Sequence, residues 1–181
     1  ALHAAVLRGS IDAVKVLIKH RANLEAILEK PTPVRRQSTD YNFHDSLLGA
    51  TPLWLAARFA EPQIMKALIK AGANTDVVNN MNYPAQRRGD NFIKDEGKIN
   101  LLMAAVGMGH WRLRMSWGTP ERRSGQLQDK ESLIFDSVSV ALTTGVPINS
   151  TDAEGQTALS FAKQRGYSSV VTLLEAAGAR N

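Results

Sequence analysis

Four stretches of the sequence repeat one pattern of residues, and this repetition constrains the fold more than any other feature. The copies align on a leucine, which is Leu2, Leu53, Leu102 or Leu159. Three residues later every copy has an alanine, at Ala5, Ala56, Ala105 and Ala162. Seven residues after the leucine come Gly9, Ala60, Gly109 and Gly166. Because several positions recur together, we expect a fold built from repeated units.

The second copy begins at Thr51 and reads TPLWLAARFAEPQIMKALIKAGAN, which looks like a helix interrupted by Pro62. A proline inside a helix costs about 3 kcal/mol, whereas a proline in the first turn is tolerated. Pro52 and Pro62 each stand before apolar residues with helical spacing. The sequence therefore predicts two helices, over residues 52–59 and 62–71, with Pro62 opening the second.

Helices this short are not stable alone, so the pairs must be stabilised by packing. One pair cannot bury its apolar face by itself, and neighbouring pairs therefore have to stack. The recurrent alanines suit this arrangement, because small side chains let adjacent helices approach closely.

The pattern resembles the ankyrin repeat, with its Thr-Pro-Leu start, paired alanines, glycine between the helices, Leu-Leu run and closing Gly-Ala. The resemblance covers the chain outside three insertions. It implies an all-α fold, an α-solenoid of about four ankyrin repeats with β-hairpin-like finger loops and a truncated first repeat. The long inserted loops are similar to those of bacterial ankyrin repeat proteins, some of which are exported.

The spacing of the copies locates the insertions. Successive aligned leucines are 51, 49 and 57 residues apart, against an ankyrin period of about 33 residues. The excess falls in the first two finger loops and, in the third copy, between the two helices. The expected single array comprises partial repeat 1 (1–26), a finger insertion (27–49), repeat 2 (50–76), a second finger insertion (77–99), repeat 3 (100–149, with a helix–helix loop insertion at about 111–131) and repeat 4 as a C-terminal cap (150–181).

The two ends of the sequence lead to different expectations. Ala1 falls inside the first repeat, so we expect a piece of a longer protein whose targeting signal would lie outside it. Localisation is therefore open, and cytoplasmic and exported proteins both fit. The last repeat carries polar residues typical of a terminal cap, which are Gln164, Arg165, Ser168 and Ser169.

Several functional classes lack their signatures. The chain has no cysteine, which excludes disulfides and thiolate metal sites. No apolar run approaches the roughly 18 residues of a membrane span. No two of its four histidines have the spacing of helical metal ligands, and no Gly-rich phosphate loop or G-x-S-x-G motif is present. We therefore expect a monomeric, non-catalytic protein without cofactor or metal.

The first finger insertion combines charge and aromatic surface in Arg35, Arg36, Tyr41 and Phe43. Arginine and tyrosine are favoured in protein interfaces, so the loop is a candidate for partner recognition. The alternative is that Tyr41 and Phe43 fold back and cover the flank of the array. Both interpretations stay open at this point.

The second finger insertion carries Tyr83, Arg87 and Arg88. Two neighbouring fingers could bring four guanidinium groups together, which would suit a carboxylate or phosphate ligand. Asp90 and the other nearby acidic residues could instead neutralise these arginines.

The third insertion interleaves Trp111 and Trp117 with arginines, which is one form of a single-stranded nucleic-acid surface. Nothing that resembles a recognised nucleic-acid module accompanies it, so we do not expect this activity.

The ankyrin resemblance implies a concave face on which the residues after the paired-alanine position contact partners. Arg58, Phe59 and Met108 occupy such positions. The alternative is that the finger insertions fold over them. The resemblance also gives His3 a structural role, but Trp54 and Met103 occupy its position in later copies, which puts the usual hydrogen bonds between repeats in doubt.

The expected function is a protein–protein interaction scaffold that binds an unidentified partner through its concave face and fingers. One alternative is an anionic ligand or nucleic acid held by the arginine-rich loops, which the net charge of +5 permits. Another is that the chain is the C-terminal scaffold of a larger enzyme.

Overall fold

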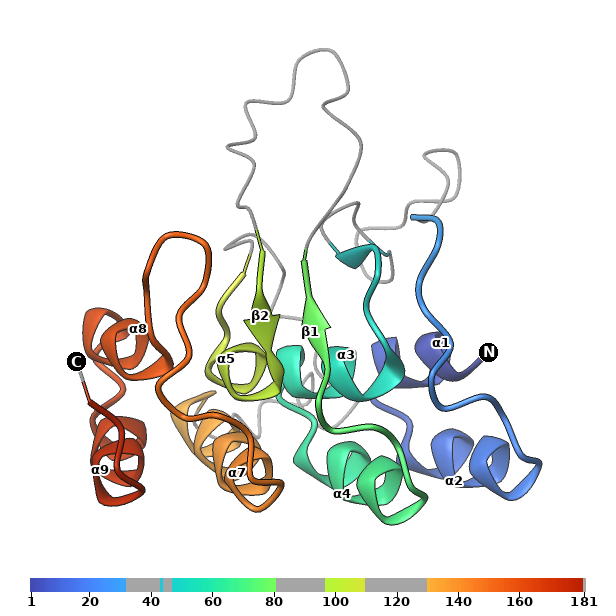
Figure 1. The fold of residues 1–181 in the computed structure, drawn as a ribbon. Helices are drawn as coiled ribbons and strands as arrows, with labels where there is room; N and C mark the ends of the chain where they lie inside the picture. The colour runs from blue at the N-terminus through green and yellow to red at the C-terminus, as the bar shows by residue number, and fades with distance from the viewer. Residues whose placement is uncertain (32–42, 44–46, 81–96, 110–129, 181) are drawn as a thin grey trace.

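The computed structural model describes residues 1–31, 43, 47–80, 97–109 and 130–180. Its helices lie in two rows (Figure 1). The inner row consists of α1 (Leu2–Leu7), α3 (Pro52–Arg58), α5 (Leu101–Val106) and α8 (Ala158–Arg165). The outer row consists of α2 (Ile11–Lys19), α4 (Pro62–Lys70), α7 (Lys130–Leu142) and α9 (Ser168–Ala176).

Each inner helix packs against the outer helix that follows it, and each row packs along its length. We name the successive units pair 1 (α1–α2), pair 2 (α3–α4), pair 3 (α5–α7) and pair 4 (α8–α9). The predicted all-α solenoid of stacked helix pairs is confirmed. The residues of the third insertion that precede α7, 110–129, lie outside the described residues.

The two prolines of pair 2 stand at the first turn of α3 and of α4, as the sequence predicted. The side chain of Thr51 begins α3 by accepting a hydrogen bond from the N–H of Trp54 at 3.2 Å. Between the two helices, Ala60 has a φ of 53°, in the left-handed region where Gly9 and Gly166 also lie. Alanine thus adopts a backbone conformation that glycine takes at lower cost.

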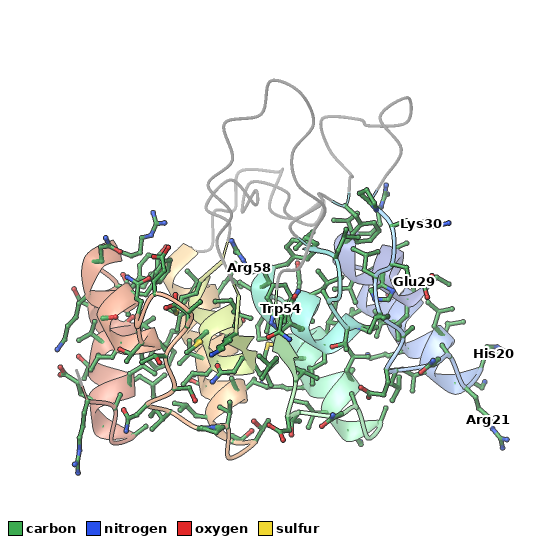
Figure 2. The ribbon with its side chains drawn as sticks, turned by 45° about the horizontal axis from the view of Figure 1, so that its top comes forward. His20, Arg21, Glu29, Lys30, Trp54 and Arg58 are labelled. Carbon is green, nitrogen blue, oxygen red and sulfur yellow. The ribbon has the colours of Figure 1, made fainter. Side chains whose placement is uncertain are left out.

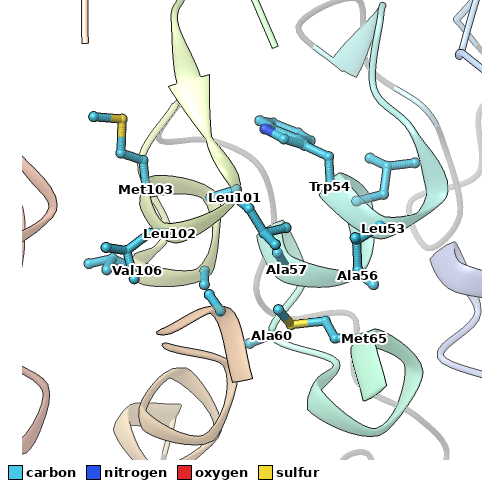
Figure 3. Close-up of a cluster of buried hydrophobic side chains, with 14 of the residues drawn as sticks. Leu53, Trp54, Ala56, Ala57, Ala60, Met65, Leu101, Leu102, Met103 and Val106 are labelled. Carbon is cyan, nitrogen blue, oxygen red and sulfur yellow. The ribbon is translucent and has the colours of Figure 1, made fainter. Parts of the chain in front are cut away.

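The core runs continuously through all four pairs. Figure 3 shows its centre, where Leu53, Ala56 and Ala57 of α3 lie across from Leu101 and Leu102 of α5. Every residue of α3 and of α5 is buried. The central inner helices are therefore enclosed within the chain along their whole length.

Between the pairs the chain forms hairpins that project beyond the inner row (Figure 1). In the first hairpin, Leu28 exchanges hydrogen bonds with Ala50 and Gly49. In the second, β1 (Val78–Asn79) pairs antiparallel with β2 (Ile99–Asn100). In the third, Thr151 forms an isolated bridge with Thr157.

Candidate partner-binding surface

The residue after the aligned leucine connects an inner helix to the hairpin that follows it. Nε2 of His3 lies 3.1 Å from the carbonyl oxygen of Ala50. The indole N–H of Trp54 donates to the carbonyl oxygen of Ile99 at 2.9 Å, in a buried environment. Ala50 and Ile99 each stand three residues before the next aligned leucine, so the two bonds are equivalent. The sequence had put this hydrogen bond between repeats in doubt, because Trp54 stands where the pattern has histidine. Trp54 makes the equivalent bond with its indole N–H.

His3 has the structural environment that the ankyrin resemblance implied. Burial lowers its pKa, and the hydrogen bond to Ala50 opposes that effect only in part. The ring of Phe43 meets the imidazole edge-on, with ring centres 6.4 Å apart. Phe43 is half-buried and packs against the core, whereas Tyr41 lies outside the described residues.

Neighbouring hairpins are also bonded directly to one another. The N–H of Asn74 donates to Oε1 of Glu25 at 2.8 Å, which joins the start of the second hairpin to the first. The N–H of Ala153 donates to the carbonyl oxygen of Gly97 at 3.1 Å, which joins the third hairpin to the second. These bonds hold the three hairpins in a fixed order along one edge of the array.

The hairpin edge exposes aliphatic side chains at a repeated position. Ile27 is 56% exposed and Val78 is 51% exposed. They stand 51 residues apart, the same spacing as Leu2 and Leu53, so they occupy one structural position in successive hairpins. Thr151 occupies this position in the third hairpin and is also exposed.

Two residues before each of these positions stands another exposed polar side chain: Glu25, Asp76 and Asn149. We call the six residues the hairpin stripe, made up of Glu25, Ile27, Asp76, Val78, Asn149 and Thr151. The stripe presents two β-branched apolar groups, each beside a carboxylate. Such a surface suits a partner that offers an apolar side chain next to a basic group.

The predicted open concave face is wrong at two of its three residues. Arg58 and Met108 are buried, and Phe59 is half-buried against the core. The reason is packing: both Arg58 and Met108 belong to stretches of the inner row that the chain itself encloses. Whether the finger insertions fold over them, as the alternative had it, is not decided, because most of the finger residues lie outside the described residues.

Arg58 reaches from α3 across pair 3 toward pair 4 (labelled in Figure 2). A β-carbon at Gly107 would lie 4.0 Å from Nη1 of Arg58 and 4.0 Å from Cε1 of Phe161, so the glycine leaves space between them. The pKa of Arg58 is lowered to about 10, mainly by burial; Tyr167 opposes this shift and the charge of Arg165 contributes to it. The guanidinium stays charged at neutral pH, in the interior rather than on a binding face.

The other predicted site residues lie outside the described residues. These are Arg35, Arg36 and Tyr41 of the first finger and Tyr83, Arg87 and Arg88 of the second. Trp111 and Trp117 of the third insertion also lie outside them.

Sequence reasoning missed the hairpin stripe. The residues predicted in the insertions were arginines and aromatic residues, and Ile27 and Val78 were not among them. The signal was available, because the 51-residue spacing that aligns the helices aligns these two residues as well.

Within the described ranges, no group of three or more His, Cys, Asp or Glu side chains could hold a metal ion. None of the helices in the same ranges combines the length and the apolar character needed to cross a membrane.

A family model described as ankyrin repeats in three copies matches residues 1–79. Over 79 residues the chain is 34% identical to protein phosphatase 1 regulatory subunit 27 of Mus musculus, a match that covers 44% of this chain and 40% of the mouse protein. The chain thus spans less than half of the length of this relative. Ankyrin repeats generally mediate protein–protein interaction and are typically non-catalytic.

The fold is similar to a crystal structure of an ankyrin repeat domain from Acinetobacter baumannii AYE, with a TM-score of 0.57 and 22% sequence identity. The match covers 99% of this chain and 64% of the other. The family match and the fold agree with the leucine, alanine and glycine positions that recur in the four copies. Residues 1–79 thus match ankyrin repeats, and the fold of the chain is that of an ankyrin repeat array.

Proposed function

We propose that this chain is a non-catalytic protein-binding module that holds its partner along the hairpin stripe. The observation that carries the proposal is the repeated exposure of Ile27 and Val78 on hairpins that are hydrogen-bonded to one another. A single exposed aliphatic residue needs no explanation, but two at one repeated position form a spaced pair of contacts. Because the hairpins are already ordered, little entropy is lost when a partner binds them.

The finger residues belong to the same proposed surface. Arg35, Arg36 and Tyr41 fall within the first hairpin's insertion, and Tyr83, Arg87 and Arg88 fall within the second's. Arg58 and Met108 have no part in the proposed contact, because they are buried.

The test replaces Ile27 and Val78 with glutamine in one variant. Both side chains are more than half exposed, so the fold should be unaffected, and circular dichroism checks this. The matched control is Val16→Gln, since Val16 is 55% exposed but lies on α2, away from the hairpins. Affinity capture from a cell extract identifies partners, and calorimetry with the purified partner measures binding. Protein phosphatase 1 is the first purified candidate, because the mouse relative is named as its regulatory subunit.

The Ile27→Gln, Val78→Gln variant should lose about 10- to 100-fold in affinity, as expected when two central apolar contacts are removed. The Val16→Gln control should bind like the unmodified chain. Equal affinity of all three proteins would remove the stripe from the interface.

Binding of an anion by the arginine-rich fingers is the main alternative. Glu25 and Asp76 would repel an anion at the stripe, so this alternative requires Arg87 and Arg88. Affinity for single-stranded DNA should then fall steeply with salt concentration and be lost in an Arg87→Ala, Arg88→Ala variant. A flat salt dependence would exclude it.

A further inference from the structure

The solvent-facing sides of α2 and α4 carry a cluster of lysines. The exposed residues of these two helices are Asp12, Lys15, Val16, Lys19, Gln63, Lys66 and Lys70. Lys15 and Lys66 stand 51 residues apart, as do Lys19 and Lys70, so each couple occupies one position of the repeat. We call these four lysines the outer basic patch.

Helical geometry brings the four lysines of the patch together. The two lysines of each helix are four residues apart, which places them on the same face with their β-carbons about 5–6 Å apart. α2 packs against α4, and the axes of packed helices lie about 8–10 Å apart. Exposed His20 and Arg21 follow Lys19 directly, and Figure 2 shows Arg21 extending away from the molecule. The patch is therefore a compact array of positive charge.

Helix stability explains only half of the patch. Lys19 and Lys70 stand in the last turns of their helices, where positive charge interacts favourably with the helix dipole. Lys15 and Lys66 stand one turn earlier and gain little from the dipole, and like charges four residues apart destabilise a helix slightly. Among the described residues, none of the four lysines forms an ion pair. The patch thus keeps a charge repulsion that the fold does not require.

The repeat does not demand lysine at these positions either. Counted back from Gly145 and Gly178, which correspond to Gly72, the equivalent residues of pairs 3 and 4 are Ser139, Thr143, Thr172 and Ala176. Those pairs expose acidic residues instead, at Asp136 of α7 and Glu175 of α9. The positive charge of the outer row is thus concentrated on pairs 1 and 2.

We propose that the outer basic patch docks on the surface of an anionic lipid bilayer. Charge complementarity selects this occupant, since clusters of four to eight basic residues are typical of surfaces that bind anionic headgroups. A lysine ammonium is a point charge without a fixed bonding geometry, so fluid headgroups can rearrange to meet it. Neither α2 nor α4 exposes an aromatic side chain on which a nucleic-acid base would stack.

This contact is separate from the hairpin stripe. The hairpins project beyond the inner row, whereas the patch belongs to the outer row (Figure 1). A chain docked through the patch would point its hairpins away from the bilayer, which leaves the stripe accessible to a protein partner. The two proposals can therefore fail independently.

The test measures cosedimentation of the full chain with large vesicles of phosphatidylcholine mixed with phosphatidylserine, and with vesicles of phosphatidylcholine alone. The variant is Lys15→Gln, Lys66→Gln, because both residues are exposed and glutamine has a similar helix propensity. The matched control is Lys30→Gln, Lys98→Gln, which removes the same charge from exposed residues of the hairpins. Circular dichroism checks that each protein is folded.

The chain should bind the mixed vesicles but not phosphatidylcholine alone, and binding should weaken as salt screens the charges. The Lys15→Gln, Lys66→Gln variant should lose about 10- to 30-fold in partition coefficient, since each lysine near an anionic bilayer contributes about fivefold. The hairpin control should bind like the unmodified chain. Absence of vesicle binding, equal binding of all three proteins, or an equal loss in the control would overturn the proposal.

Two other probes test other occupants of the patch. Single-stranded DNA and poly-glutamate are titrated against the same three proteins. If the chain ignores the mixed vesicles and binds one of these polymers through Lys15 and Lys66, the patch recognises nucleic acid or an acidic protein segment, and the lipid proposal is wrong. Vesicle binding that depends on the patch, with no such dependence for either polymer, supports it.

Discussion

Pair 2 and pair 4 place their helices in the same register but differ in their neighbours. Pair 2 packs between pairs 1 and 3, and every residue of α3 is buried. Pair 4 packs on pair 3, and Lys163, Gln164 and Arg165 of α8 are exposed. The chemistry at shared positions follows this difference, since Ala57 of pair 2 corresponds to Lys163 of pair 4.

Hydrogen bonding follows the same contrast. Trp54 of pair 2 donates forward to the carbonyl of Ile99 in the next hairpin. Ser160, at the same position in pair 4, bonds back to Thr157 and closes a capping box at the start of its own helix. At this position the side chain of pair 2 bonds to the next hairpin, whereas the side chain of pair 4 bonds within its own helix start.

The largest expected effect compares Leu68→Ala with Leu174→Ala, which truncate the same buried position in the two pairs. Leu68→Ala should lower the free energy of unfolding by about 4 kcal/mol, and Leu174→Ala by about 2–3 kcal/mol. The cavity in pair 2 is enclosed on both sides, while pair 4 can relax toward solvent. Urea unfolding followed by circular dichroism measures both. A larger loss for Leu174→Ala would contradict the contrast.

An intermediate effect is expected for Trp54→Phe, which leaves the carbonyl of Ile99 without its donor. The loss should be about 2 kcal/mol, because an unsatisfied buried polar group costs about 1–3 kcal/mol. Hydrogen exchange should increase in β2 as well as in α3. Ser160→Ala is the matched change in pair 4 and should cost about 1 kcal/mol, with faster exchange confined to α8. If both variants speed exchange in the same way, the bond from Trp54 to Ile99 does not stabilise the next hairpin.

The smallest effect is expected for the ion pair between Lys163 and Glu175, whose side chains are 39% and 51% exposed. Solvent screens an exposed pair, so Glu175→Gln should change the free energy of unfolding by less than about 0.5 kcal/mol. Salt titration of both proteins checks this. A loss of 1 kcal/mol or more would show that this ion pair stabilises the last pair despite its exposure.

Much of the fold could be predicted because it depends on local signals. Pro52 and Pro62 marked the first turns of α3 and α4, and the alignment of Ala60 with glycines agrees with its left-handed backbone. These signals act over a few residues, so the sequence displays them directly.

The candidate site was predicted less well. Arg58 and Met108 looked like exposed contacts because their positions lie at the end of an inner helix, yet both are buried. Burial depends on residues far away in the chain, and repeat spacing does not report it. The role of Trp54 was hidden for the same reason, since its acceptor Ile99 is 45 residues away.

The sequence by itself determined the register of the helix pairs, because periodic leucines, alanines and glycines encode local geometry. The bounds of the insertions between them stay a prediction. Only the tertiary structure decided which repeated positions are covered and which are open. It buried Arg58 and Met108 and exposed Ile27 and Val78 on hairpins that are bonded to one another. Exposure is set by stacked neighbours, so residues with the same place in the repeat have different environments along the array.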